Sequence, residues 1–174
     1  MGPAAMIAEE ENTMRYTLIP SPLGDLLAVR DDDGITGLYL PTGKNPQQPE
    51  DGWTRDDAAF DDVRSQLGEY FAGERTEFDL PLHPRGTAFQ KQVWKALLDI
   101  PYGQTATYGQ TALSIGNPTA SRAVGLANGQ NPISIVVPCH RVIGADGSLT
   151  GYGGGLAAKQ WLLAHEVAHS GLFA

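Results

Sequence analysis

The chain has 174 residues and a formal net charge of −8, which excludes a uniformly basic nucleic-acid-binding protein. It contains a single cysteine, Cys139, so an internal disulfide is excluded as well. The sequence has no apolar stretch of membrane-spanning length and no signal-peptide pattern, so we expect a cytoplasmic protein that does not enter a membrane.

The first half of the chain has the pattern of a small antiparallel sheet with one helix. Three strand-like segments occur in succession, and the sequence from Asp31 to Gly34 has the composition of a hairpin turn. Apolar residues at helical spacing then predict an amphipathic helix around Phe60, Val63, Leu67 and Phe71. The predicted strands cover residues 14–20, 23–30 and 35–40, with a further strand at 77–82.

Two stretches in this half are predicted to lack regular structure. Residues 1–13, which include an acidic run, are expected to form a disordered tail. Residues 41–57, rich in proline, glycine and charge, are expected to form a loop. A linker at 81–86 then divides an N-terminal domain of residues 14–84 from a C-terminal domain of residues 85–174.

The charge is distributed unequally between the two halves. Residues 1–84 carry a net charge of −11, whereas residues 85–174 carry +3. This asymmetry indicates that the C-terminal half is the part that faces nucleic acid. So small a positive charge predicts few phosphate contacts and a shallow dependence of binding on salt.

Residues 107–130 have helix-turn-helix spacing. Residues 108–115 and 119–128 predict two short helices, with Asn117 as N-cap and Pro118 at the first position of the second helix. Two short helices packed in a core would give the same pattern. The second helix is rich in small residues, and a thin helix favours the narrow minor groove over the major groove. These small residues are Ala120, Ser121, Ala123, Gly125 and Ala127.

The cysteine follows an apolar, β-branched run. Residues 133–137 predict a buried strand that ends at Cys139, with His140 as the next residue. Side chains of adjacent residues in an extended chain point to opposite sides, so proton transfer between them needs a bridging water or a kink at Pro138. A buried cysteine can also serve packing alone.

A histidine that acts as a base needs a partner that holds its tautomer, and only two acids follow Asp99. Asp146 lies in a Gly-Ala-Asp-Gly turn, which predicts a solvent-exposed carboxylate. Glu166 follows Leu162 and Leu163 by four and three residues on the apolar stripe of a predicted helix from 156 to 167. Glu166 is therefore either a buried partner of His140 or a helix-end residue paired with solvent or a lysine.

Several ordered motifs together resemble the O6-alkylguanine-DNA alkyltransferase family. They are Pro-Cys-His-Arg-Val at 138–142, Gly-Tyr-Gly-Gly-Gly-Leu at 151–156 and Lys-Gln-Trp-Leu-Leu-Ala-His-Glu at 159–166. The match extends back through Asn131-Pro132, Arg-Ala-Val-Gly at 122–125, Tyr108 and Ile-Pro-Tyr-Gly at 100–103. It covers roughly residues 85–167.

The resemblance implies DNA repair by irreversible, single-turnover transfer of a methyl or other alkyl group from O6 of guanine to the protein. Cys139 would be the nucleophile, His140 the base acting through a water, and Glu166 the group that orients His140. Asn131 would order the active-site turn. An unperturbed thiol with a pKa near 8.5 is only a few per cent ionised at neutral pH, so such activation is needed.

The resemblance also implies the binding residues. Tyr108 and the backbone N–H of Gly153 would donate to the guanine, and carbonyl groups around Cys139 and Val142 would hold its exocyclic amine. Ser134, Tyr152 and Gly154 would complete the substrate pocket. Arg122 would enter the base stack from the minor groove while Tyr108 helps to rotate the damaged nucleotide out, on a helix surface formed by Ala120, Ser121, Ala123 and Gly125.

The expected fold is α+β in two parts: a ribonuclease H-like N-terminal domain with a small antiparallel sheet, and a mostly helical, winged-helix-like C-terminal domain. The expected partner is double-stranded DNA bound by a monomer, without a cofactor. Some relatives hold structural zinc through cysteines and histidines, but this chain keeps His83 without a second thiol, so no metal site is expected. A cysteine hydrolase or a non-catalytic helix-turn-helix regulator would each explain only part of the pattern.

Overall fold

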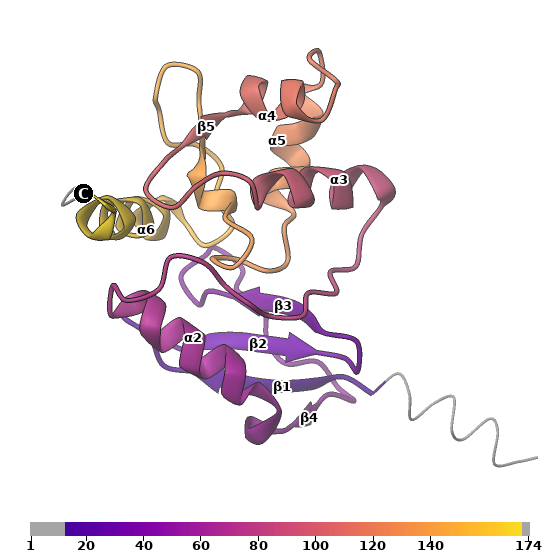
Figure 1. Cartoon of the computed structure of the whole chain (residues 1–174). Coiled ribbons are helices and arrows are strands. Elements are labelled where there is room, and N and C mark those ends of the chain that lie inside the picture. The colour runs from indigo at the N-terminus through magenta and orange to yellow at the C-terminus, as the bar shows by residue number, and fades with distance from the viewer. Residues whose placement is uncertain (1–12, 172–174) are drawn as a thin grey trace, which may run out of the picture.

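The computed structural model describes residues 13–171 and has the α+β architecture expected from the sequence. A sheet with one helix across it forms the N-terminal part, and a helical C-terminal part lies against the β3 side of that sheet (Figure 1). The predicted disordered tail lies outside the described residues except for Thr13. Buried apolar side chains of both parts join in one core, so the two parts fold against each other.

The N-terminal sheet has the strand order β3-β2-β1-β4. Strands β1 (Arg15–Ile19), β2 (Leu26–Arg30) and β3 (Ile35–Tyr39) pair antiparallel, as predicted. The Asp31 carboxylate closes the β2–β3 hairpin, because its Oδ1 accepts hydrogen bonds from the backbone N–H groups of Asp33 (2.8 Å) and Gly34 (3.1 Å). The predicted hairpin turn is therefore confirmed.

Two predictions for this half were wrong. The expected loop contains a short strand, β4 (Thr54–Arg55), which pairs parallel with β1. The expected strand at 77–82 is irregular and forms only one bridge, between Leu82 and Ile35. Pro81 has no backbone N–H to donate, so it accepts from the N–H of Ile35 but cannot continue a ladder.

The predicted amphipathic helix is present as α2 (Asp61–Phe71), preceded by the 3₁₀ turn η1 (Asp57–Phe60). It crosses one face of the sheet (Figure 1). Its buried side chains are Val63, Leu67 and Tyr70, which follow one another at four- and three-residue spacing. Tyr70, which the sequence analysis passed over, is fully buried, whereas Phe71 is only partly buried.

Up to residue 171, the C-terminal part contains four α-helices. Thr87 and Thr107 begin two of them with capping boxes, in which each threonine exchanges hydrogen bonds with a glutamine three residues later. Two short strands form a parallel pair beside them. The elements are α3 (Ala88–Leu97), β5 (Ala106–Thr107), α4 (Tyr108–Ser114), α5 (Ser121–Gly129), β6 (Val142–Ile143) and α6 (Leu156–His169).

Helices α4 and α5 form the predicted helix-turn-helix pair, but the start of the second helix was predicted wrongly. Helix α5 begins at Ser121, after Ala120, and no side chain caps it. The backbone carbonyl of Asn117 accepts from the N–H of Ala120 (3.0 Å), so residues 117–120 form a turn of their own. Asn117 and Pro118 therefore precede the helix instead of opening it.

The predicted strand at 133–137 is also absent. The N–H of Val136 bonds to Ser134 O (2.8 Å), and the N–H of Cys139 bonds to Val137 O (2.8 Å), so the run folds into two γ-turns. Ile135, at the centre of the first, has a φ of 73°, which is rare for a β-branched residue. Only Ile133 pairs as a strand residue, with Leu38. The chain then enters the 3₁₀ turn η2 (Cys139–Arg141).

Candidate active site

Cys139 lies at the start of η2 and is 5% exposed. Burial raises the pKa of its thiol to about 11, although a hydrogen bond from Asn131 and the positive charge of Lys159 act in the opposite direction. The thiol is therefore neutral at physiological pH in this structure. Any reaction as a thiolate requires a base that removes its proton.

His140 and Glu166 form a buried pair. His140 Nε2 lies 2.7 Å from Glu166 Oε2, and the two side chains are 0% and 1% exposed. Burial lowers the pKa of His140, while the hydrogen bond and charge of Glu166 act to raise it. A neutral imidazole that donates from Nε2 to the carboxylate keeps Nδ1 as an acceptor, and Nδ1 is buried without a hydrogen-bond partner among residues 13–171.

Glu166 is held by more groups than the sequence indicated. Arg141 donates from Nε to Oε1 (2.7 Å) and from Nη2 to Oε2 (3.0 Å). Tyr70, on α2, donates its hydroxyl to Oε2 (2.7 Å). Burial alone would raise the pKa of Glu166, but the hydrogen bonds from His140 and Arg141 hold it well below its usual range. Glu166 is thus ionised, and of the two alternatives left open by the sequence the structure shows the buried partner of His140.

Two asparagines order the turn that carries the thiol. Asn131 donates to the carbonyls of Val137 (2.9 Å) and Ile133 (3.3 Å) and accepts from the N–H of Ile133 (3.1 Å). These bonds fix the two γ-turns, in the place expected for Asn131. Asn128, at the end of α5, donates to Cys139 O (3.3 Å) and was not singled out from the sequence.

Lys159 is a second residue that the sequence analysis missed. Its side chain is buried on α6, and Nζ donates to Val142 O (2.6 Å) and Thr150 O (2.8 Å). Burial lowers its pKa, and the neighbouring Cys139 acts to raise it. Lys159 precedes Glu166 by seven residues, two helical turns, so its place on the same buried face was a signal that could have identified it.

Tyr108 connects the helix-turn-helix pair to the glycine-rich loop. Its hydroxyl lies 3.2 Å from both Thr150 O and Thr150 Oγ1. Its ring lies against α5, because a Cβ on Gly125 would be 3.5 Å from Tyr108 Cδ1. The glycine-rich loop that follows Thr150 contains Tyr152 and Gly153, and burial raises the pKa of the Tyr152 hydroxyl well above its usual value. Three of the predicted substrate-binding residues, Tyr108, Tyr152 and Gly153, therefore lie in or beside one loop.

The N-terminal domain supports this loop directly. Thr42 Oγ1 donates to Gly154 O (2.6 Å). At position 43 the backbones are so close that a Cβ would lie 2.1 Å from Gly153 O, so only glycine fits without movement. A cavity of about 300 Å³ lies between the domains beside Ser134. Its lining includes Asn131, Gly153 and Gly154 from one domain and residues 45–47 from the other.

Apart from Tyr108 on α4, the predicted DNA-binding residues lie on the outer surface of α5 or directly before it. Arg122 and Ala123 are exposed, and Ala120, Ser121 and Gly125 are partly exposed. Exposed leucines accompany them, with Leu113 on α4 and Leu126 on α5 each 65% exposed. The helix-turn-helix pair thus presents a surface of small and apolar side chains with one arginine, next to the loop that carries the predicted substrate residues.

His83 belongs to a surface cluster away from the thiol. Its Nδ1 lies 2.8 Å from Asp31 Oδ2, and Arg85 Nη2 lies 3.6 Å from the same oxygen. Asp33 lies close enough for its carboxylate to join Asp31 and His83 around one point. The Arg85 cation lies beside the same Asp31 carboxylate, whose other oxygen closes the β2–β3 turn. Among residues 13–171, no helix is long and apolar enough to cross a membrane.

The sequence of this chain matches two family models and several known proteins. The model of the 6-O-methylguanine DNA methyltransferase ribonuclease-like domain matches residues 14–84, and that of the DNA binding domain of the same enzyme matches residues 88–168. A methylated-DNA–protein-cysteine methyltransferase of Methanosarcina acetivorans is 52% identical over 88% of this chain and 98% of its own length. The enzyme of that name from Mycolicibacterium paratuberculosis is 54% identical over 90% of this chain and 94% of its own length.

Solved structures agree with this assignment. The crystal structure of Mycobacterium tuberculosis OGT in complex with DNA superimposes with a TM-score of 0.83 at 52% identity, over 90% of this chain and 94% of that one. The crystal structure of the O6-methylguanine methyltransferase of the same organism gives a TM-score of 0.84 at 50% identity, over 93% of this chain and 100% of that one. The chain belongs to the 6-O-methylguanine DNA methyltransferase family.

Proposed function

We propose that this protein repairs DNA by transferring a methyl or other alkyl group from O6 of guanine to its own Cys139, once per chain. The observation that carries the proposal is the buried Cys139–His140–Glu166 arrangement, next to a helix-turn-helix pair in a chain that matches the family along both domains. No cofactor is needed, because the protein thiol itself accepts the alkyl group.

The transfer begins with removal of a proton from Cys139. His140, whose Nε2 is bonded to Glu166, takes the proton at Nδ1 through a water, and Glu166 stabilises the imidazolium that forms. The sulfur electron pair then forms a bond to the alkyl carbon, and the bond from that carbon to O6 breaks. Its electron pair passes to the guanine, which takes up a proton. The products are S-alkylcysteine and unmodified guanine.

The leaving guanine gains negative charge, and the site offers donors for it. We assign the Gly153 N–H to O6, the Tyr108 hydroxyl to the base ring, and the carbonyls of Cys139 and Val142 to the exocyclic amine. Lys159 already donates to Val142 O, so it fixes the direction of that carbonyl. Ser134, Tyr152 and Gly154 form the remaining walls in this proposal, and the cavity between the domains supports the places of Ser134 and Gly154, which line it.

DNA is the partner, and its damaged base is presented out of the duplex. An O6-alkylguanine inside a stacked duplex cannot reach a thiol that is 5% exposed, so the nucleotide has to rotate out. The exposed Arg122 fills the vacated stack from the minor groove, where the small side chains of α5 permit close approach. The protein acts as a monomer in this proposal, and the cytoplasmic location expected from the sequence stays a prediction.

Stoichiometry tests the proposal. Excess duplex oligonucleotide with one O6-methylguanine is mixed with the protein, and repaired guanine and intact protein mass are followed over time. We expect a burst equal to the protein concentration and then a plateau, with one methyl group on the peptide that contains Cys139. Product beyond one equivalent, or a methyl group on another residue, would contradict the proposal.

Cys139→Ser serves as the control. A serine hydroxyl is far less acidic than a thiol, so this variant is expected to bind methylated DNA with the affinity of the wild type and to transfer nothing. Transfer by Cys139→Ser at the rate of the wild type would show that another residue accepts the methyl group.

A further inference from the structure

Tyr70 belongs to the N-terminal domain, yet both its ends are bound by consecutive residues of α6. Its hydroxyl donates to Glu166 Oε2 (2.7 Å), and its backbone carbonyl lies 2.8 Å from His165 Nε2. The side chain is fully buried. Burial and the adjacent Glu166 raise the pKa of the hydroxyl far above its usual value, so it remains a hydrogen-bond donor at every pH at which the protein is folded.

The hydroxyl shares its acceptor with the catalytic histidine. Glu166 Oε2 accepts hydrogen bonds from the Tyr70 hydroxyl, His140 Nε2 and Arg141 Nη2. Among the described residues, Oε1 accepts only from Arg141 Nε. A carboxylate has about four acceptor positions over its two oxygens, so three donors on one of them compete. The positive end of the tyrosine O–H dipole points at the same oxygen as the imidazole N–H. It therefore opposes a gain of positive charge on His140.

Other charged and titratable groups also surround the His140–Glu166 pair. They are Cys139 and Arg141 in η2, Lys159 in α6, Tyr152 in the glycine-rich loop and Tyr102 after α3. Arg141 and Lys159 both act against a charged His140. Tyr70 is the member of this set that the N-terminal domain supplies.

We propose that Tyr70 is a positioning residue of the transfer reaction, through which the N-terminal domain limits the charge on His140 and keeps the thiol of Cys139 protonated until substrate is bound. The inference rests on the proposed function, because it assumes that His140 accepts the proton of Cys139. In the resting protein, the shared oxygen leaves His140 a weak base. The thiol is then protected from electrophiles other than the bound alkylguanine.

Removal of the hydroxyl tests the proposal. In Tyr70→Phe, Glu166 Oε2 keeps His140 and Arg141 and binds His140 more strongly, so the imidazolium and the thiolate are both favoured. We expect the pH–rate curve for single-turnover methyl transfer to move to lower pH by roughly one unit. Alkylation of Cys139 by iodoacetamide at pH 7.5 without DNA should become about three to ten times faster.

Tyr102→Phe is the matched control. The Tyr102 ring lies 6.2 Å from that of Tyr70, and its buried hydroxyl has no hydrogen-bond partner among residues 13–171. Loss of that hydroxyl should leave the pH–rate curve in place. Replacement of Tyr70 by 3-fluorotyrosine, whose hydroxyl is a stronger donor, should move the curve to higher pH. This variant keeps the side-chain hydrogen bond, so it also tests the proposal if Tyr70→Phe fails to fold.

The outcomes separate this inference from the proposed function. A wild-type protein that transfers no methyl group contradicts the proposed function, and the iodoacetamide rates then still report on Tyr70. Where the wild type transfers, a Tyr70→Phe curve that is lower at every pH but unshifted assigns Tyr70 a structural role only and overturns the inference. A shift to higher pH, or an equal shift in Tyr102→Phe, overturns it as well.

Discussion

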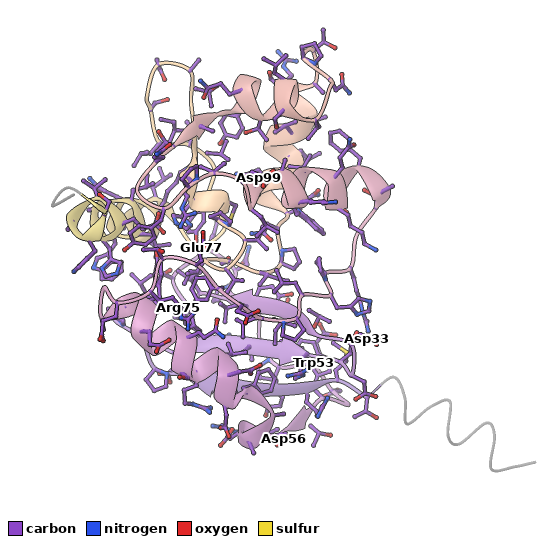
Figure 2. The ribbon with its side chains drawn as sticks, in the orientation of Figure 1. Asp33, Trp53, Asp56, Arg75, Glu77 and Asp99 are labelled. Atoms are coloured by element: carbon purple, nitrogen blue, oxygen red, sulfur yellow. The ribbon has the colours of Figure 1, made fainter. Side chains whose placement is uncertain are left out.

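The C-terminal half of the molecule holds the residues proposed to react, and the N-terminal half holds them in place. The difference in net charge between the halves indicates only part of this division. The C-terminal half, with a net charge of +3, holds the thiol, its base and the exposed face of α5, while the N-terminal half carries −11. Acidic residues such as Asp33 and Asp56 lie on the N-terminal domain, away from α4 and α5 (Figure 2). The acidic domain is therefore turned away from the proposed DNA surface.

The N-terminal half nevertheless contacts the active site at three points. Leu38 of β3 exchanges backbone hydrogen bonds with Pro132 and Ser134, before the thiol. Thr42 holds the glycine-rich loop, and Tyr70 reaches the catalytic carboxylate. The comparison teaches that residues able to react are concentrated in one half, whereas their geometry depends on both.

The largest effect is expected from Glu166→Gln. This change leaves the Arg141 guanidinium, 7% exposed, without its charged partner, so we expect a loss of about 3–5 kcal/mol of stability at pH 7. Because the pKa of Glu166 is lowered in the folded protein, its contribution is complete above the unfolded value near 4.3 and is lost as the pH falls through the folded value. Thermal unfolding from pH 7 to pH 2 measures this.

The same variant should move the pH–rate curve for methyl transfer to higher pH, because His140 loses the charge that stabilises its protonated form. Glu69→Gln is the control, since Glu69 pairs with Arg75 on the surface and should cost about 1 kcal/mol or less. Equal losses of stability in both variants would show that the buried Glu166 ion pair contributes no more to stability than an ion pair on the surface.

A second prediction separates DNA handling from chemistry within the C-terminal half. Arg122→Ala and Tyr108→Ala should each slow repair of duplex DNA by about 100-fold, because base extrusion costs a few kcal/mol. For Arg122→Ala, reaction with free O6-benzylguanine, where that compound is accepted, should change far less. Tyr108→Ala should also slow that reaction, because it removes the donor assigned to the base ring. Lys91→Ala, an exposed charge change on α3, should leave both rates unaltered. Equal slowing of Arg122→Ala on both substrates would reject the assignment of Arg122 to base extrusion.

A smaller effect should reveal the support from the N-terminal half. Thr42→Val removes the hydrogen bond to Gly154 O, so we expect about 1 kcal/mol less stability and a several-fold slower transfer. Single-turnover rates with methylated duplex measure it. Thr76→Val, at an exposed position, is the control. Unchanged transfer in Thr42→Val would mean that the glycine-rich loop holds its shape without the N-terminal domain.

The smallest effect concerns the acidic surface. Asp33→Asn removes one exposed negative charge on the domain that faces away from the proposed DNA surface. At physiological salt such a charge is screened beyond about 8 Å, so the dissociation constant for duplex DNA should change less than about twofold. A clear rise in affinity, measured by fluorescence anisotropy, would place this surface nearer to DNA than the fold indicates.

The sequence predicted those parts of the site that carry a local signal. Cys139 and His140 are adjacent in the chain, and the apolar stripe of α6 made Glu166 a candidate for a buried acid, which the structure confirms. Tyr70 and Thr42 had no such signal, because Tyr70 meets Glu166 across 96 positions and Thr42 meets Gly154 across 112. Contacts between residues so far apart in the sequence depend on how the N-terminal sheet packs against the C-terminal part. Hydrophobic periodicity does not predict that packing.

The fold was predicted well where periodicity and turns agree, as in the β2–β3 hairpin and α2. It was predicted wrongly at residues 133–137, because a short buried apolar run has the same pattern whether it is extended or coiled. Here the Asn131 side chain donates to Val137 O and accepts from the N–H of Ile133, and these hydrogen bonds favour the coiled conformation. The start of α5 was misplaced for a related reason, since an Asn-Pro pair fits a turn as well as a helix start.

The two γ-turns have a consequence for solubility. In the sequence Ile-Ser-Ile-Val-Val at 133–137, every residue except the serine is β-branched and apolar, and none is charged, which is typical of segments that assemble into cross-β aggregates. In the native fold, Ile135 is held at a φ of 73° and the segment has no extended edge to offer another chain. Local unfolding that frees Ile135 releases that strain and exposes the segment at once. Aggregation of damaged or overheated protein should therefore start at the loop that carries the reactive thiol.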